Sequence, residues 1–197
     1  MATVIIDRLP MNLPNQLTVA RLFITILFVA ALSVDFPGNR IWALALFLVA
    51  TLTDYLDGVI ARKWNLITDF GKLMDPLADK VLSASAFILL IGYGAIPAWA
   101  VILIISREFL ITGLRLLAIS KNIVLPAEKI GKHKTAWQMI TIIFFLILLA
   151  FGGKAGAAWI TPAWDYAGTV LVAITVILTA YSGIAYGIKH RDLITSR

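Results

Sequence analysis

Long apolar runs with few charged residues recur from one end of the sequence to the other. They fall at about residues 22–34, 41–53, 81–106, 135–153 and 166–188. The run at 81–106 is interrupted by Gly92, Gly94 and Pro97, which predict a turn between two helices, because proline lacks a backbone donor and glycine favours a tight reversal. Six helices are therefore predicted, with expected ranges of about 14–34, 39–62, 76–93, 97–119, 131–152 and 164–188.

The composition places these helices in a bilayer. Of the 197 residues, 60% are apolar and only 14% are charged, whereas a soluble domain is about 25% charged. Spanning helices of about 20 residues each use most of the apolar positions and leave little chain for a soluble domain. The prediction is an all-α, polytopic membrane protein, a bundle of six transmembrane helices in one domain over residues 1–197. Residues 1–12 fit either a short interfacial segment or a frayed terminus, and no cleavable signal peptide is expected.

The basic residues predict the orientation of this bundle. With alternating helices, fifteen of the seventeen Lys and Arg residues fall on one side, and only Arg40 and Lys154 fall on the other. Because cytoplasmic loops are enriched in basic residues, both termini are expected in the cytoplasm. The net charge of +6 then reflects topology and anionic headgroups, so nucleic acid is not an expected partner. Cysteine is absent, which excludes disulfides, Cys-rich zinc sites and thiol catalysis.

Carboxylates crowd at the predicted cytoplasmic ends of the second and third helices. Five of the eleven acidic residues lie within twenty-six positions: Asp54, Asp57, Asp69, Asp75 and Asp79. At about 100° per residue, Asp57 lies about 60° from Asp54, and Asp79 about 40° from Asp75. Each helix thus presents two carboxylates on one face, with Pro76 expected in the first turn of the third helix.

Four converging carboxylates repel one another unless cations neutralise them. Oxygen ligands at a cytoplasmic face suit Mg²⁺ or Mn²⁺, and two such ions about 4 Å apart commonly clamp a displacement at phosphorus. Gly58, Ala61 and Arg62 share the face of the second helix. Small side chains let a substrate approach the backbone, and arginine pairs with phosphates. A helix end or a loop ion pair would explain one aspartate, but hardly all four.

Eight residues at fixed spacing resemble a family signature. The pattern Asp54-x2-Asp57-Gly58-x2-Ala61-Arg62-x8-Gly71-x3-Asp75-x3-Asp79 is similar, without a departure, to the signature of the CDP-alcohol phosphotransferases. The resemblance implies a six-helix membrane enzyme that uses divalent metal and displaces CMP from a CDP-linked donor with an alcohol. It implies that the four aspartates are metal ligands and that Asp79 is also the general base. It assigns Gly58, Ala61, Arg62 and Gly71 to the donor site.

Three more stretches resemble the bacterial phosphatidylglycerophosphate synthases of this family. They are Asn12-Leu13-Pro14-Asn15-x-Leu17-Thr18-x2-Arg21, Arg107-Glu108-Phe109-x3-Gly113-Leu114-Arg115 and Gly131-Lys132-x-Lys134-Thr135-x2-Gln138. Such enzymes transfer a phosphatidyl group from CDP-diacylglycerol to glycerol 3-phosphate. The resemblance therefore implies these two substrates, an active site facing the cytoplasm at the bacterial inner membrane, and a homodimer. The resemblance gives no role to residues 36–48 and 151–165.

A cationic sector is predicted on the fourth and fifth helices without reference to the family. Arg107 and Arg115 lie on the fourth helix beside Glu108, a carboxylate that orients them, and Lys132 and Lys134 begin the fifth. Arginine inside a bundle needs an anion, and a phosphate dianion satisfies several donors at once. Glycerol 3-phosphate carries such a group and inositol and serine do not, so these four residues are predicted to bind the acceptor. Lysines at cytoplasmic helix ends also commonly snorkel to headgroups.

Two predictions concern the helix ends. Asn15 and Thr18, one turn apart at the start of the first helix, are assigned to the CDP-diacylglycerol site, with ordinary helix capping as the alternative. Tyr186, like the tryptophans near helix ends, is expected in the interfacial belt rather than in the site.

Alternative functions remain at this point. Within the family, the acceptor could be phosphatidylglycerol, as in a cardiolipin synthase, or serine or inositol. A cation transporter using intramembrane carboxylates would need them near the bilayer midplane, commonly in broken or repeated helices, and no repeat is visible. An aspartyl intramembrane protease would give no role to Gly58, Arg62 or the cationic sector.

Overall fold

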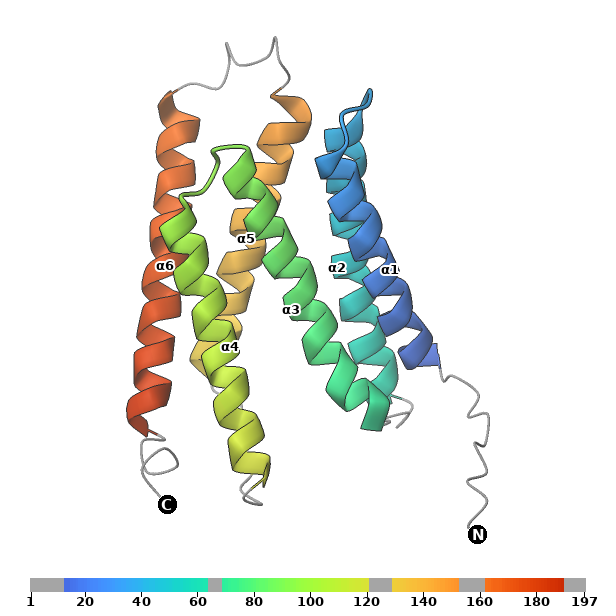
Figure 1. Ribbon diagram of the computed structural model, residues 1–197, viewed down its shortest axis with the longest axis vertical. Helices are drawn as coiled ribbons and strands as arrows, with labels where there is room; N and C mark the ends of the chain where they lie inside the picture. The colour runs from blue at the N-terminus through green and yellow to red at the C-terminus, as the bar shows by residue number, and fades with distance from the viewer. Residues whose placement is uncertain (1–12, 64–68, 121–128, 153–161, 190–197) are drawn as a thin grey trace.

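The computed structural model describes residues 13–63, 69–120, 129–152 and 162–189, and within these ranges it is helical with no strand. The described chain forms six helices (Figure 1): α1 Leu13–Ser33, α2 Asn39–Lys63, α3 Asp69–Gly92, α4 Ala98–Ser120, α5 Lys129–Phe151 and α6 Pro162–Lys189. The all-α, six-helix prediction is confirmed. Helix α1 begins and helix α6 ends at the same end of the bundle, as an even number of alternating helices requires.

Helix α3 begins at Asp69 and not near residue 76. Pro76 therefore lies inside the helix, and its predicted place in the first turn is wrong. Aspartate is a residue type that favours the first turn of a helix, and the sequence offers one at position 69. The internal proline removes one backbone hydrogen bond, a loss that membrane helices tolerate when neighbouring groups satisfy the freed carbonyl.

The turn between α3 and α4 has the predicted form. Gly94 adopts a φ of 69°, a left-handed conformation that costs little without a Cβ atom. Its N–H donates to the carbonyl of Ile91 at 2.9 Å, and the N–H of Ala95 donates to that of Leu90 at 3.0 Å. These bonds satisfy the last carbonyls of α3 and let α4 run back alongside it.

The six helices pack as two groups of three. Helix α1 lies along α2 and also contacts α3, whereas α6 packs against α5 and α4. Contacts of α5 with α2 and α3, and of α3 with α4, join the groups. The rings of Phe28 and Phe47, 5.5 Å apart, belong to the buried apolar core. Between α5 and α6, the buried hydroxyls of Thr141 and Thr175 hydrogen-bond at 2.8 Å, which fixes that pair.

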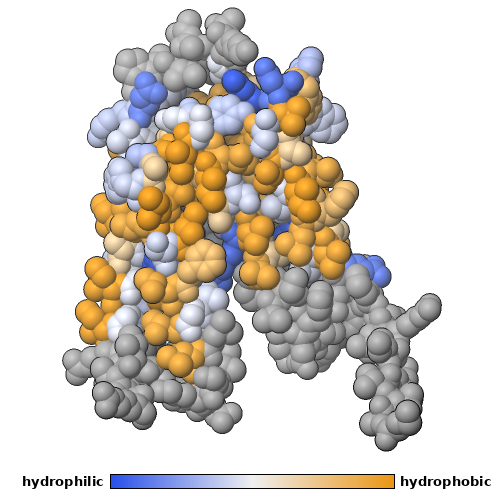
Figure 2. Space-filling model, viewed as in Figure 1, coloured by the Kyte–Doolittle hydropathy of each residue, from blue (hydrophilic) through white to orange (hydrophobic). Residues whose placement is uncertain are grey.

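The outer surface of the bundle is apolar. Figure 2 shows hydrophobic side chains over most of the described surface on one face, with hydrophilic atoms deep between the helices. Ile102 and Ile177 are 64% and 65% exposed, as suits contact with lipid. In the described residues, three helices are long and apolar enough to cross a membrane, over Gln16–Ser33, His133–Phe151 and Trp164–Lys189. Charged side chains also lie inside the bundle, and those of Arg21 on α1 and Lys134 on α5 are buried.

Candidate active site

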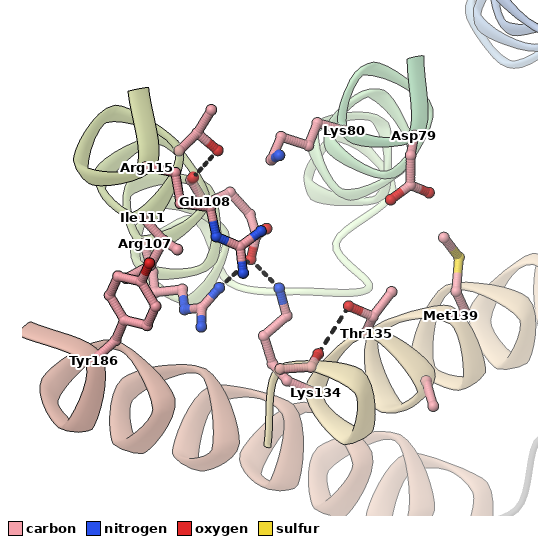
Figure 3. Close-up of a pocket in the computed structure, with 13 residues that line it drawn as sticks. Asp79, Lys80, Arg107, Glu108, Ile111, Arg115, Lys134, Thr135, Met139 and Tyr186 are labelled. Atoms are coloured by element: carbon pink, nitrogen blue, oxygen red, sulfur yellow. Dashed lines mark hydrogen bonds and ion pairs between the residues drawn. The ribbon is translucent and has the colours of Figure 1, made fainter. Parts of the chain in front are cut away.

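A cavity of about 480 Å³ lies between α3, α4, α5 and α6, near the ends where α5 begins and α6 finishes. Figure 3 shows its lining side chains converging from these helices. The charged lining residues are Asp79, Lys80, Arg107, Glu108, Arg115 and Lys134. Four of the six belong to the sites predicted from sequence.

The carboxylate side of the cavity belongs to α3. Asp79 is half-buried and points into the space from this helix, across from the basic side chains of α4 and α5. It interacts electrostatically with Asp54 of α2, so the structure brings these two predicted ligands together. Asp54 also forms an ion pair with Arg21 of α1, whose side chain is fully buried. The sequence placed Arg21 one turn beyond Thr18, in a stretch that resembles the family, but did not predict its ion pair with Asp54.

Thr18 is buried in α1 one turn before Arg21, beside the helix that carries Asp54. Asp57 follows Asp54 by one turn of α2, and Asp75 precedes Asp79 by one turn of α3. The structure does not describe the side chains of the other predicted residues of this half. The predictions that lie outside the described side chains are those for Asn15, Asp57, Gly58, Ala61, Arg62, Gly71, Asp75 and, on α5, Lys132.

The donor atoms on this side fit a divalent cation. Among the described residues, no group of three or more His, Asp or Glu side chains forms a metal site, and two of the four predicted ligands fall within that description. Asp54 and Asp79 supply carboxylate oxygens from adjacent helices and repel each other. A divalent cation would remove that repulsion, and such hard oxygen donors suit Mg²⁺ or Mn²⁺.

The cationic side is built around one carboxylate. Oε1 of Glu108 accepts a hydrogen bond from NH1 of Arg107 at 3.4 Å and another from Nζ of Lys134 (Figure 3). Lys134 is 2% exposed, so α5 holds it inside the bundle instead of letting it snorkel. Arg107 and Lys134 thus share the single negative charge of Glu108, and each side chain has further N–H donors for a ligand. Such an arrangement attracts a second, multiply charged anion.

Tyr186 of α6 is 1% exposed and lines the cavity, which corrects its predicted place in the interfacial belt. The guanidinium carbon of Arg115 lies 5.9 Å from the centre of its ring, within range of a cation–π interaction. The sequence held a signal for this position. Thr175, Thr179, Ser182 and Tyr186 recur at helical spacing and are all buried, so one face of α6 is polar and directed inward.

Residues 11–181 match the family model described as CDP-alcohol phosphatidyltransferase, most of the 197-residue chain. The chain belongs to the CDP-alcohol phosphatidyltransferase family. Every charged residue of the cavity lies within the match, while Tyr186 lies just beyond it. Membership makes the protein a transferase and removes the transporter and protease alternatives. Enzymes of this family generally depend on divalent metal, in keeping with the carboxylates of α2 and α3.

Curated relatives carry a more specific name. A protein of Bacillus subtilis is 37% identical, over 79% of this chain and 93% of its own, and one of Rickettsia felis is 36% identical, over 91% and 95%. Both are named CDP-diacylglycerol–glycerol-3-phosphate 3-phosphatidyltransferase. A Mycobacterium tuberculosis protein, 36% identical over 89% of this chain and 79% of its own, is named a probable phosphatidylglycerophosphate synthase.

Proposed function

We propose that this enzyme transfers a phosphatidyl group from CDP-diacylglycerol to glycerol 3-phosphate, giving phosphatidylglycerophosphate and CMP. The names of its relatives support this reaction. The observation that carries the choice of acceptor is the cavity in which Asp79 faces Arg107, Arg115 and Lys134. A small phosphorylated alcohol can place its hydroxyl at the carboxylate and its phosphate among the cations. Phosphatidylglycerol, serine and inositol offer no such terminal dianion.

The proposal includes a membrane topology. All six helices cross the bacterial inner membrane, both termini are cytoplasmic, and the cavity opens to the cytoplasm. The basic residues support this orientation, because fifteen of the seventeen Lys and Arg residues fall on one side, and cytoplasmic loops are enriched in basic residues. As in the family, we also propose a homodimer.

The donor site is proposed for α1, α2 and α3. The acyl chains of CDP-diacylglycerol stay in the lipid while the nucleotide enters between these helices. Its contacts are assigned to residues near the cavity end of the three helices: Asn15, Thr18, Gly58, Ala61, Arg62 and Gly71. Asp54, Asp57, Asp75 and Asp79 would hold two Mg²⁺ or Mn²⁺ ions, which neutralise charge on the pyrophosphate.

The acceptor site is proposed for α4 and α5. Arg107, Arg115 and Lys134, together with Lys132, bind the phosphate of glycerol 3-phosphate through charge-assisted hydrogen bonds. Glu108 keeps Arg107 and Lys134 side by side before the acceptor arrives. Positioning of this kind supplies most of the catalysis in phosphoryl transfer.

Asp79 completes the site as the general base. Its carboxylate accepts the proton of the 1-hydroxyl, whose oxygen attacks the β-phosphorus in line. The bond from that phosphorus to the bridging oxygen breaks, and CMP leaves with the electron pair. The half-buried position of Asp79 at the edge of the cationic cavity supports this role.

The test is an acceptor panel with purified protein in lipid nanodiscs that contain CDP-diacylglycerol. Labelled glycerol 3-phosphate, phosphatidylglycerol, serine and inositol are supplied in turn with Mg²⁺ or Mn²⁺, and CMP and lipid products are measured. We expect phosphatidylglycerophosphate with glycerol 3-phosphate alone, and no turnover after chelation of the metal. Cardiolipin formed from phosphatidylglycerol would overturn the choice of acceptor.

A further inference from the structure

A glycine of α6 lies directly against the side chain of Arg107. A Cβ atom placed on Gly183 would stand 3.0 Å from Cγ of Arg107 and 4.0 Å from its Cβ and Nε. Carbon atoms attract best at about 3.5–4.0 Å, so a larger residue at position 183 has to displace the arginine. The three nearest atoms all belong to Arg107, which makes the contact specific to that side chain.

Arg107 is held on its other side by Glu108. Its side chain is 13% exposed, and its NH1 atom lies 3.4 Å from Oε1 of Glu108. Within the part of the chain that the structure describes, its buried Nε atom has no hydrogen-bond partner. A buried donor of this kind is costly until a ligand accepts from it. The guanidinium is attached to the aliphatic stem of Arg107, its Cβ, Cγ and Cδ atoms. Any shift of this stem moves the guanidinium relative to both Glu108 and Lys134.

We propose that Gly183 is a positioning residue for the phosphate of the acceptor. Its lack of a side chain lets the stem of Arg107 lie against α6 and thereby sets the place of the guanidinium in the cavity. This inference rests on the proposed function, because it takes Arg107 to bind the phosphate of glycerol 3-phosphate. Alanine is the better helix former, so glycine brings α6 no gain in helix stability. The close approach of Arg107 supplies the reason for it.

Helix α6 provides two matched controls. Gly187 lies one turn further along, and a Cβ atom there meets nothing within 4 Å. Gly168 lies toward the other end of α6, where a Cβ atom would stand 3.0 Å from Cζ of Phe145. Alanine at 187 thus tests the change of backbone propensity alone. Alanine at 168 tests tight helix packing away from the cavity.

The first experiment compares Gly183→Ala with Gly187→Ala and Gly168→Ala in nanodiscs, with both substrates varied. Since misplacement of a binding group by about 1 Å can cost 10²-fold, a displacement of a few tenths of an ångström is expected to raise the KM for glycerol 3-phosphate about tenfold. The KM for CDP-diacylglycerol should stay unchanged in all three variants. The inference is overturned if Gly183→Ala keeps the wild-type KM for the acceptor, or if Gly187→Ala or Gly168→Ala raises it equally.

The second experiment is a double-mutant cycle. Arg107→Ala removes the Cγ atom, so adding Gly183→Ala to that variant should change the KM for the acceptor no further. Where turnover is too slow, equilibrium dialysis of labelled glycerol 3-phosphate measures the same difference. An equal loss in both backgrounds would show that Gly183 acts through general packing, against the inference. If the wild-type protein does not use glycerol 3-phosphate, the proposed function fails. If the wild-type protein uses it and Gly183→Ala has the same KM for it, only this inference fails.

Discussion

The two groups of helices differ in the charged side chains that they bring together near the cavity. The group α1–α3 brings Asp54 and Asp79 near each other, with the buried Arg21 paired to Asp54. The group α4–α6 brings two basic side chains together, Arg107 and Lys134, and pairs both with Glu108. The first group thus brings two carboxylates together, with Lys80 beside them at the cavity, and the second group brings basic side chains together around one carboxylate. Each half is prepared for a ligand of the opposite sign.

On the proposed assignment of the sites, this difference keeps the two substrates apart. A metal-bound pyrophosphate suits the carboxylate half, and a free phosphate dianion suits the cationic half. Glycerol 3-phosphate bound among carboxylates would meet repulsion, as would bare metal ions among arginines. Changes in one half should therefore alter the KM of one substrate and spare the other.

The largest effect is expected at Asp79, where the halves meet. Asp79→Asn keeps the shape of the side chain but removes the base, and loss of a general base lowers kcat by about 10³-fold. CDP-diacylglycerol binding should stay largely intact, as measured with labelled lipid. Asp165→Asn, at the exposed start of α6, is the matched control. A near-wild-type rate for Asp79→Asn would rule out the base role.

The two halves also differ in what the sequence could predict. Asp54 and Asp79 belong to eight residues on two consecutive helices, where spacing predicts one face of α2 for Asp54 and Asp57 and one face of α3 for Asp75 and Asp79. The six helices could be predicted from the length of the apolar runs, because a helix that crosses a bilayer needs about 20 apolar residues. The start of α3 was predicted wrongly, because Pro76 suggested a helix boundary and the helix begins at Asp69.

The cationic half depends on tertiary packing, which spacing along one helix does not reveal. Glu108 meets Lys134 from a position 26 residues away, and Gly183 meets Arg107 from a third helix. The sequence predicted that Glu108 orients the arginines of α4, but not that Glu108 also pairs with Lys134 of α5. It misplaced Tyr186 because an aromatic residue near a helix end is typical of the interfacial belt.

Lys134→Met should show most clearly that the cationic half affects the KM of one substrate and not that of the other. The methionine fills the same buried space, but one charge-assisted hydrogen bond to the acceptor is lost, a loss of about 2 kcal/mol. We expect the KM for glycerol 3-phosphate to rise about 30-fold, since 1.4 kcal/mol is tenfold, with the KM for CDP-diacylglycerol unchanged. Arg40→Met, which removes the same charge at the opposite end, should leave both constants alone. Equal increases in both KM values would contradict the division of the cavity.

Arg115→Ala should have a smaller effect in the same direction. Arg115 is exposed, and exposed charges contribute less than buried ones because water and salt screen them. We expect the KM for glycerol 3-phosphate to rise about fivefold, which corresponds to about 1 kcal/mol, and the difference from wild type to shrink as KCl is added. Arg115→Lys keeps the charge, so its KM for glycerol 3-phosphate should lie between the values of the wild type and Arg115→Ala. An unchanged KM in Arg115→Ala at low salt would remove this residue from the phosphate site.

The smallest effect is expected at Tyr186, beneath Arg115. Its ring is buried on α6 and lies 5.9 Å from the guanidinium carbon, so it stabilises one orientation of an otherwise exposed side chain by about 0.5–1 kcal/mol. Tyr186→Leu should raise the KM for glycerol 3-phosphate about threefold and have no effect in an Arg115→Ala background. Tyr186→Phe keeps the ring and should stay close to wild type. If phenylalanine is as damaging as leucine, the hydroxyl and not the ring serves the site, and α6 acts on the cationic half through a different contact.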